Sequence, residues 1–111
     1  MATLYHNPRC SKSRQAKALL DEAGIRYEEC LYLKADLNAE HYRDLLIQLG
    51  GEPITHLRKS EQPFGLIPAD ADLDQIAQTL AEHPILLERP VLVTEQGAKV
   101  CRPPELVQTL I

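Results

Sequence analysis

The sequence predicts an α/β domain with a four-stranded mixed sheet flanked by helices, and two observations lead to this class. A strand, a helix and a second strand follow one another directly at the N-terminus. A connection this short between the two strands requires that they be parallel, with a right-handed crossover. Near the C-terminus, two short apolar runs separated by a Gln-Gly turn predict an antiparallel hairpin. Helical patterns fill the middle of the chain.

The N-terminal strand–helix–strand segment can be delimited residue by residue. Residues 2–6 alternate weakly between apolar and polar side chains, and Pro8 breaks this strand because proline lacks a backbone N–H. The spacing of apolar residues predicts a helix over 11–23, and Gly24 suits its C-terminus. Tyrosines and leucine favour extended structure in the second strand, which we expect over 25–33.

The middle of the chain is predominantly helical. Asn38 caps a helix that ends in a Gly-Gly pair, and Asp72 caps a third long helix that Pro84 stops. Between them, residues 52–71 are rich in loop signals and contain one short helical candidate at 54–59. A loop-rich segment of this length in a small domain often carries function.

The C-terminal part completes the sheet. Residues 91–94 and 98–101 predict the two hairpin strands, and the prolines at 103 and 104 suit the first turn of a C-terminal helix. Four strands in a mixed sheet with helices on both faces form the thioredoxin architecture. We therefore expect residues 1–111 to fold as a single thioredoxin-like domain.

Composition narrows the classes of function. The net charge of −4 disfavours a general nucleic-acid binder, although a local basic site can still attract small anions. No apolar run is long enough to cross a membrane, and we expect no secretory leader. Three widely spaced cysteines indicate a reducing compartment. We expect a cytoplasmic protein without nucleic-acid or membrane partners, and a monomer.

Cys10 is the strongest candidate for chemistry. It stands where the first strand turns into the first helix, so it meets the positive end of the helix dipole and several unpaired N–H groups. Both effects favour the nucleophilic thiolate, as do basic neighbours. Those neighbours are His6, Arg9, Lys12 and Arg14. The alternative is a small core residue, since free cysteine is among the most buried residue types.

Three other roles for Cys10 require residues that the sequence lacks. A redox dithiol needs Cys-x-x-Cys, but Ser13 fills the fourth position, so a resolving thiol must come from elsewhere. A phosphatase-like Cys-x5-Arg loop needs an arginine at the position of Ala16. A zinc site needs four ligands, and His6 with Cys10 supplies only one pair. We therefore expect no metal.

Arginines form the second candidate set. Arg58, Arg89 and Arg102 each stand at the edge of a predicted element, where side chains can converge on a shared cleft. A guanidinium matches a tetrahedral oxyanion through paired hydrogen bonds. Spacing alone does not distinguish these three from the other arginines, because a lone surface arginine is usually solvated or salt-bridged.

Four further residues each have an interpretation that is purely structural. His6 either biases Cys10 toward thiolate or is a structural histidine with satisfied hydrogen bonds. Ser13 either donates its hydroxyl to the sulfur or fills the first helical turn. Cys30 and Cys101 lie in strand-like apolar settings, and we expect both in the core.

Four motifs, in chain order, resemble those of the glutaredoxin-linked arsenate reductase family. They are residues 5–14 (YHNPRCSKSR), 57–63 (LRKSEQP), 83–94 (HPILLERPVLVT) and 97–105 (GAKVCRPPE). Together they span nearly the whole chain. A Ser-Lys pair after the cysteine replaces the Gly-Thr of the best-known members, and the chain ends soon after its last helix begins. Both features resemble a shorter subgroup.

The resemblance implies a thioredoxin-like enzyme that reduces arsenate to arsenite, a step of arsenic detoxification. Cys10 matches the family nucleophile, and His6 and Ser13 match residues that help to activate the thiol. The family's oxyanion-binding arginines match Arg58, Arg89 and Arg102. The resemblance also implies a cis peptide bond before Pro90, facing the cysteine.

The implied reaction needs outside thiols but no bound cofactor. Cys10 would attack arsenic to form a covalent adduct, glutathione as co-substrate would displace it, and glutaredoxin would complete the reduction. This accords with the missing second cysteine. An arginine clamp would offset the double charge of arsenate, because an anionic sulfur must approach it.

Two alternative functions belong to the same scaffold. One is a thiol-transfer enzyme that acts on glutathione adducts instead of arsenate. The other is a redox-responsive regulator that binds RNA polymerase, but such regulators usually carry Cys-x-x-Cys, which Ser13 interrupts. The three motif arginines favour oxyanion chemistry over both.

Overall fold

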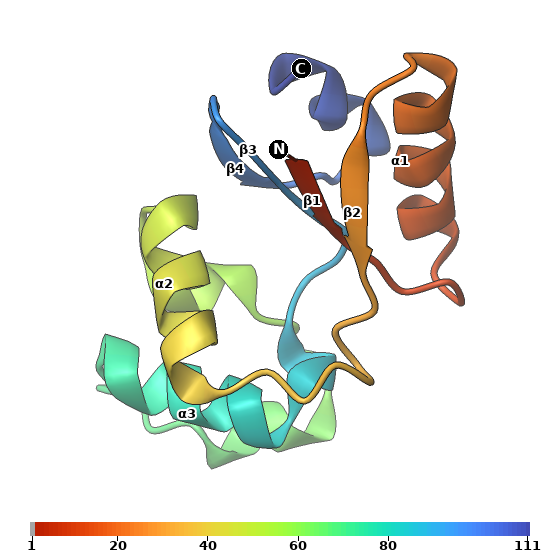
Figure 1. The fold of residues 1–111 in the computed structure, drawn as a ribbon. Coiled ribbons are helices and arrows are strands. Elements are labelled where there is room, and N and C mark those ends of the chain that lie inside the picture. The colour runs from red at the N-terminus through yellow and green to blue at the C-terminus, as the bar shows by residue number, and fades with distance from the viewer. Residues whose placement is uncertain (1) are drawn as a thin grey trace. The chain divides into compact units, whose positions relative to one another are not determined.

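The computed structural model describes residues 2–111, which form two compact units (Figure 1). The first unit contains the described residues up to Ala35 together with Arg89–Ile111, and the second contains Asp36–Glu88. None of the helices within residues 2–111 combines the length and apolarity that a membrane span requires.

A four-stranded mixed sheet forms the centre of the first unit. Its order is β2-β1-β3-β4, with β1 parallel to β2 and antiparallel to β3, and β3 antiparallel to β4. The predicted parallel pair and hairpin are thereby confirmed. The strands are β1 (Ala2–Tyr5), β2 (Tyr27–Cys30), β3 (Val91–Thr94) and β4 (Gly97–Val100).

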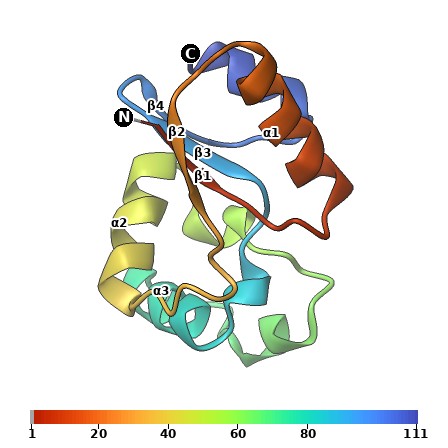
Figure 2. The same ribbon diagram turned by 45° about the vertical axis from the view of Figure 1, so that its right-hand side comes forward.

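Helix α1 (Ser11–Glu22) and the 3₁₀ helix η4 (Pro104–Thr109) cover one face of this sheet. They lie side by side in both views (Figure 2). Leu4, Leu20 and Leu92 meet there with no exposed surface, because alternate strand residues point to the same face. Each such leucine contributes about 1.5–3 kcal/mol by burial. The predicted C-terminal helix is 3₁₀ and not α, since so short a run gains little from α-helical cooperativity.

The second strand is shorter than the sequence predicts, and one cysteine prediction is wrong. β2 lies at the edge of the sheet and pairs with β1 alone, so pairing stops where the last residue of β1, Tyr5, meets Cys30. With a neighbour on one side only, Cys30 is half-buried and not a core residue. Cys101 is fully buried, as expected.

The second unit is helical. α2 (Ala39–Leu49) packs on α3 (Leu73–Glu82). The predicted caps are present: Asn38 Oδ1 accepts the N–H of His41, and Asp72 forms a reciprocal capping box with Gln75. The short helix predicted at 54–59 is a 3₁₀ turn. The 3₁₀ helices of this unit are η1 (Pro53–His56), η2 (Gln62–Leu66) and η3 (Pro84–Leu86).

Candidate active site

Cys10 stands at the junction of β1 and α1. Its backbone is extended (φ −93°, ψ 123°), and it occupies the cap position of a 12-residue helix. Asn7 shapes the loop before it: the Asn7 carbonyl accepts the Cys10 N–H at 3.0 Å, and its Oδ1 accepts the Arg9 N–H at 3.0 Å. The thiol is therefore half-buried at the positive end of a helix.

The surroundings of Cys10 stabilise its thiolate. Burial by itself raises the pKa of this thiol, but the backbone N–H of Ser13, the guanidinium of Arg89 and the backbone N–H of Lys12 outweigh burial, and the net pKa is lowered. Burial raises the pKa of Cys30, and the charge of Glu28 adds to the increase.

Of the three cysteines, Cys101 has the environment that most favours the neutral thiol. Burial raises its pKa to about 11. Cys10 is therefore the cysteine of this chain whose environment favours the ionised, nucleophilic form.

His6 and Ser13 form a buried pair beside the cysteine loop. His6 is 3% exposed and Ser13 is fully buried, and His6 Nδ1 lies 2.6 Å from Ser13 Oγ. The same oxygen accepts the N–H of Asn7 at 3.0 Å. The Ser13 hydroxyl is thus engaged with His6, and Ser13 acts on the sulfur of Cys10 through its backbone N–H.

The surroundings of His6 favour its neutral imidazole form. Burial lowers its pKa, the nearby carboxylate of Glu29 opposes this, and the charges of Lys17 and Arg14 add to the lowering. Nε2 of His6 lies 4.0 Å from Oε1 of Glu29. The sequence carries no sign of a role for Glu29, because two consecutive glutamates on a short strand indicate only solvated side chains.

Arg89 and Arg102 meet at the end of the sheet. Both precede a cis-proline, which confirms the cis bond expected at Arg89–Pro90. Arg102 Nη1 donates to the carbonyl of Arg89 at 3.1 Å, and the Cys101 N–H donates to the carbonyl of Pro90 at 2.8 Å. The buried Nε of Arg89 has no hydrogen-bond partner within the described residues, so it retains a free donor.

Arg58 belongs to the second unit, and its place beside Cys10 stays a prediction. Its backbone N–H donates to the carbonyl of Leu86 at 2.7 Å. Its guanidinium, on a side chain about three-quarters buried, is paired with two carboxylates: Nε lies 3.2 Å from Glu88 Oε1, and Nη1 lies 3.8 Å from Glu61 Oε2. The sequence offered one sign of this pairing, because Glu61 lies in the same motif as Arg58 and Glu88 in the next.

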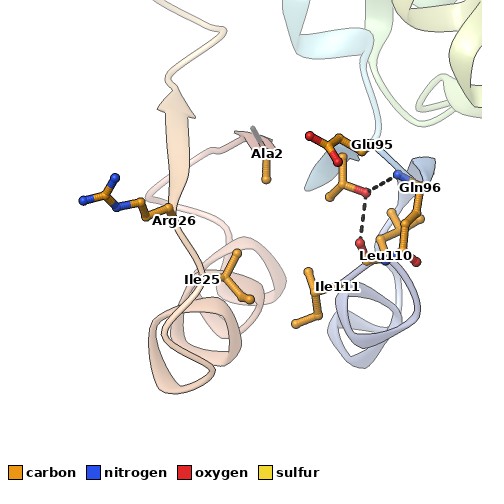
Figure 3. A pocket seen from close by; sticks show the side chains of 8 residues that line it. Ala2, Ile25, Arg26, Glu95, Gln96, Leu110 and Ile111 are labelled. Carbon is orange, nitrogen blue, oxygen red and sulfur yellow. Dashed lines mark hydrogen bonds between the residues drawn. The ribbon is translucent and has the colours of Figure 1, made fainter.

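Two pockets of the first unit differ in their chemistry. One, of about 470 Å³, is lined by the loop residues 6–9 and by Leu31, Leu33 and Lys34, directly before the cysteine. The other, of about 220 Å³, lies beside Ala2 and includes Arg26, whose side chain points away from the other labelled residues (Figure 3). The described residues that line this second pocket include no cysteine. The reactive thiol is therefore not at the second pocket.

A metal centre is not formed by the part of the chain that the structure describes. Within residues 2–111, no three His, Cys, Asp or Glu side chains gather closely enough to hold an ion.

These features define a class: a thioredoxin-like α/β protein with a stabilised thiolate at a helix N-terminus. The sequence profile of the ArsC family matches residues 5–110, and the chain belongs to this family. The solved structure of an arsenate reductase from Vibrio cholerae superposes with a TM-score of 0.92 at 35% identity, covering 99% of this chain and 97% of that one. This neighbour confirms the predicted fold class.

Two sequence relatives show the breadth of the family. An arsenate reductase of Escherichia coli is 34% identical and aligns with 98% of this chain and 79% of its own length. The uncharacterized protein YfgD of Escherichia coli K12 is 39% identical, with 97% of this chain and 94% of its own length aligned.

Proposed function

We propose that this chain is an arsenate reductase that works through the Cys10 thiolate and takes its electrons from glutathione and glutaredoxin. The observation that supports this most directly is the sulfur of Cys10. It is held at a helix N-terminus with its pKa lowered despite burial, and the guanidinium of Arg89 contributes to the lowering. In a member of the ArsC family, that arrangement suits attack on a tetrahedral oxyanion.

Binding of arsenate would fall to the arginines of the motifs. Arg89 has a free buried donor, and the guanidinium of Arg102 donates to the backbone carbonyl of Arg89, which supports a shared role of the two arginines in binding. Planar guanidinium groups bind two oxygens at once and offset charge as the sulfur approaches. Arg58 would complete the clamp if the oxyanion competes successfully with Glu88 for its Nε–H.

The electron count explains the need for outside thiols. Arsenate plus two thiols gives arsenite, one disulfide and water, so two electrons pass to arsenic. Cys10 would form the S–As bond as water leaves, and glutathione would displace Cys10 from arsenic, which regenerates the Cys10 thiol. The glutaredoxin thiolate would then attack the glutathione sulfur, so that the electron pair of that S–As bond stays on arsenic as arsenite and one mixed disulfide forms. Neither Cys30 nor Cys101 is a suitable second thiol, because burial raises the pKa of each.

The proposed location of the protein follows from this chemistry. Glutathione and glutaredoxin stay reduced in the cytoplasm, which is where three free cysteines would persist. We propose a cytoplasmic monomer without metal or bound cofactor.

A coupled assay with arsenate, glutathione and glutaredoxin tests the proposal. The wild type should consume reduced glutaredoxin in proportion to arsenate, Cys10→Ser should abolish turnover, and Cys30→Ser should retain it. Omission of glutathione or glutaredoxin should each stop the reaction. Turnover that survives Cys10→Ser would refute the mechanism. Activity on glutathione adducts without activity on arsenate would refute the substrate.

A further inference from the structure

We propose that Glu29 is a positioning residue for the reactive cysteine, acting through the tautomer of His6. The inference rests on the proposed function only in taking Cys10 as the reactive thiol. Glu29 lies on β2, outside every motif of the candidate site, and it connects a surface ion-pair network to the buried His6.

Glu29 is held in place by α1. Its Oε2 accepts a hydrogen bond from Lys17 Nζ at 2.9 Å, while Oε1 faces His6 Nε2 at 4.0 Å. Lys17 is held in turn by Tyr27 Oη, also at 2.9 Å, and that hydroxyl donates to Asp21 at 2.7 Å. The carboxylate is therefore fixed between a lysine and an imidazole.

The charge of Glu29 selects one neutral form of His6. At 4.0 Å the carboxylate acts by its field, since the distance is too long for a hydrogen bond. A proton on Nε2 is attracted to it, whereas a lone pair on Nε2 is repelled. The favoured tautomer thus carries its proton on Nε2, and its Nδ1 accepts the hydroxyl proton of Ser13.

This tautomer orients the groups that hold Cys10. Because the Ser13 hydroxyl donates its hydrogen bond to His6, the lone pairs of Ser13 Oγ are available to accept the N–H of Asn7. The Asn7 carbonyl in turn accepts the N–H of Cys10. The opposite tautomer would donate from Nδ1 into Ser13 Oγ and leave the buried hydroxyl proton without this acceptor. The loop would loosen, and the helix N–H groups would stabilise the thiolate less.

The charges facing His6 come from two elements. Glu29 approaches from β2, and Lys17 and Arg14 approach from α1. Removal of the carboxylate would leave the two cations unopposed, and their field favours a lone pair on Nε2. Glu29→Gln should therefore shift His6 toward the Nδ1–H form.

The experiment compares Glu29→Gln with Glu28→Gln, which removes the same charge from the neighbouring, exposed position. Long-range ¹H–¹⁵N spectra report which His6 nitrogen carries the proton, and iodoacetamide alkylation across pH reports ionisation of Cys10. Wild type and Glu28→Gln should show the Nε2–H form. Glu29→Gln should gain the Nδ1–H form, and its Cys10 should alkylate several-fold more slowly at neutral pH.

The direction in which the alkylation midpoint of Cys10 moves distinguishes positioning by Glu29 from a simple loss of negative charge. Loss of a negative charge alone would leave the alkylation midpoint of Cys10 unchanged or move it to lower pH, and Glu28→Gln measures this effect, whereas the loosened loop moves the midpoint to higher pH. An unchanged tautomer, or a midpoint that moves as in Glu28→Gln, would overturn the inference.

A second variant keeps the test independent of how well Glu29→Gln folds. Glu29→Asp retains the negative charge at this position, so the Nε2–H form should persist and Cys10 should alkylate faster than in Glu29→Gln. Loss of that form in a folded Glu29→Asp would also contradict the inference. If wild-type Cys10 proved no more reactive than Cys30, the proposed function would fail, while the tautomer spectra would still decide the role of Glu29.

Discussion

His6 Nδ1 and Ser13 Oγ lie 2.6 Å apart, and this buried contact bridges the loop that carries the reactive cysteine. His6 directly follows β1, and its backbone N–H donates to the carbonyl of Cys30 at 2.9 Å. Ser13 lies in the first turn of α1. The contact therefore ties the end of the strand to the start of the helix, with Cys10 between them.

Removal of the Ser13 hydroxyl should destabilise the fold. Ser13→Ala leaves buried His6 Nδ1 and the Asn7 N–H without their partner, which should lower the free energy of unfolding by about 1–3 kcal/mol. Urea denaturation measures this. Ser11→Ala changes an exposed serine of the same helix and should stay within about 0.5 kcal/mol of the wild type. Equal effects of the two changes would show that the buried contact contributes nothing.

The three cysteines should differ in reactivity. Because the pKa of Cys10 is lowered while those of Cys30 and Cys101 are raised, Cys10 should be alkylated first at neutral pH. Mass spectrometry of peptides after timed iodoacetamide treatment gives the three rates. In urea the rates should converge, since the environments are lost. Similar rates in the folded protein would contradict an activated thiolate.

Stability should fall as the pH drops below the ordinary pKa of histidine. The pKa of His6 in the folded protein lies below its usual 6.5, chiefly through burial, so the unfolded chain binds a proton more readily. The contribution of His6 is therefore complete above pH 6.5 and is lost as the pH falls toward the lowered value. Urea titrations at a series of pH values measure this slope. His6→Gln should flatten it, and an unchanged slope would assign it to other groups.

Arg89 should not tolerate lysine. Arg89→Lys keeps the charge but removes the planar fork and the free Nε donor. Loss of one charged hydrogen bond is worth about 1.5–3 kcal/mol, so kcat/KM for arsenate should fall about 10- to 150-fold. Arg26→Lys, at the pocket without a thiol, is the matched control and should leave turnover unchanged. Comparable losses in both variants would remove Arg89 from the clamp.

Glu88 should weaken oxyanion binding by occupying Arg58. Its carboxylate lies 3.2 Å from Arg58 Nε, with both side chains about three-quarters buried. Glu88→Gln should free this donor and lower KM for arsenate about two- to fivefold, the scale of a partly exposed ion pair. Glu82→Gln, an exposed residue of α3, is the control. An unchanged KM in Glu88→Gln, beside a raised one in Arg58→Ala, would show that the ion pair does not compete with substrate.

Local signals predicted the elements well and their ends less well. The caps at Asn38 and Asp72 and the hairpin of β3 and β4 depend on residues within a few positions of one another, so the sequence is sufficient for them. The end of β2 at Cys30 depends on the length of its partner β1, which no pattern within 25–33 expresses. The half-burial of Cys30 follows from the same edge position.

The candidate site likewise combines local features with contacts between residues far apart in the chain. Placement of Cys10 at a helix N-terminus is a local property, because the turn and the first helical residues adjoin it in the chain. Its meeting with Arg89 is not local: β3 runs antiparallel beside β1, and Tyr5 pairs with Val91, so the start of one strand meets the end of the other. The approach of Glu29 to His6 likewise needs the parallel pairing of β2 with β1. Short-range turn and helix energetics thus determine where the thiol stands, while its charged surroundings depend on strand pairings between residues far apart in the chain.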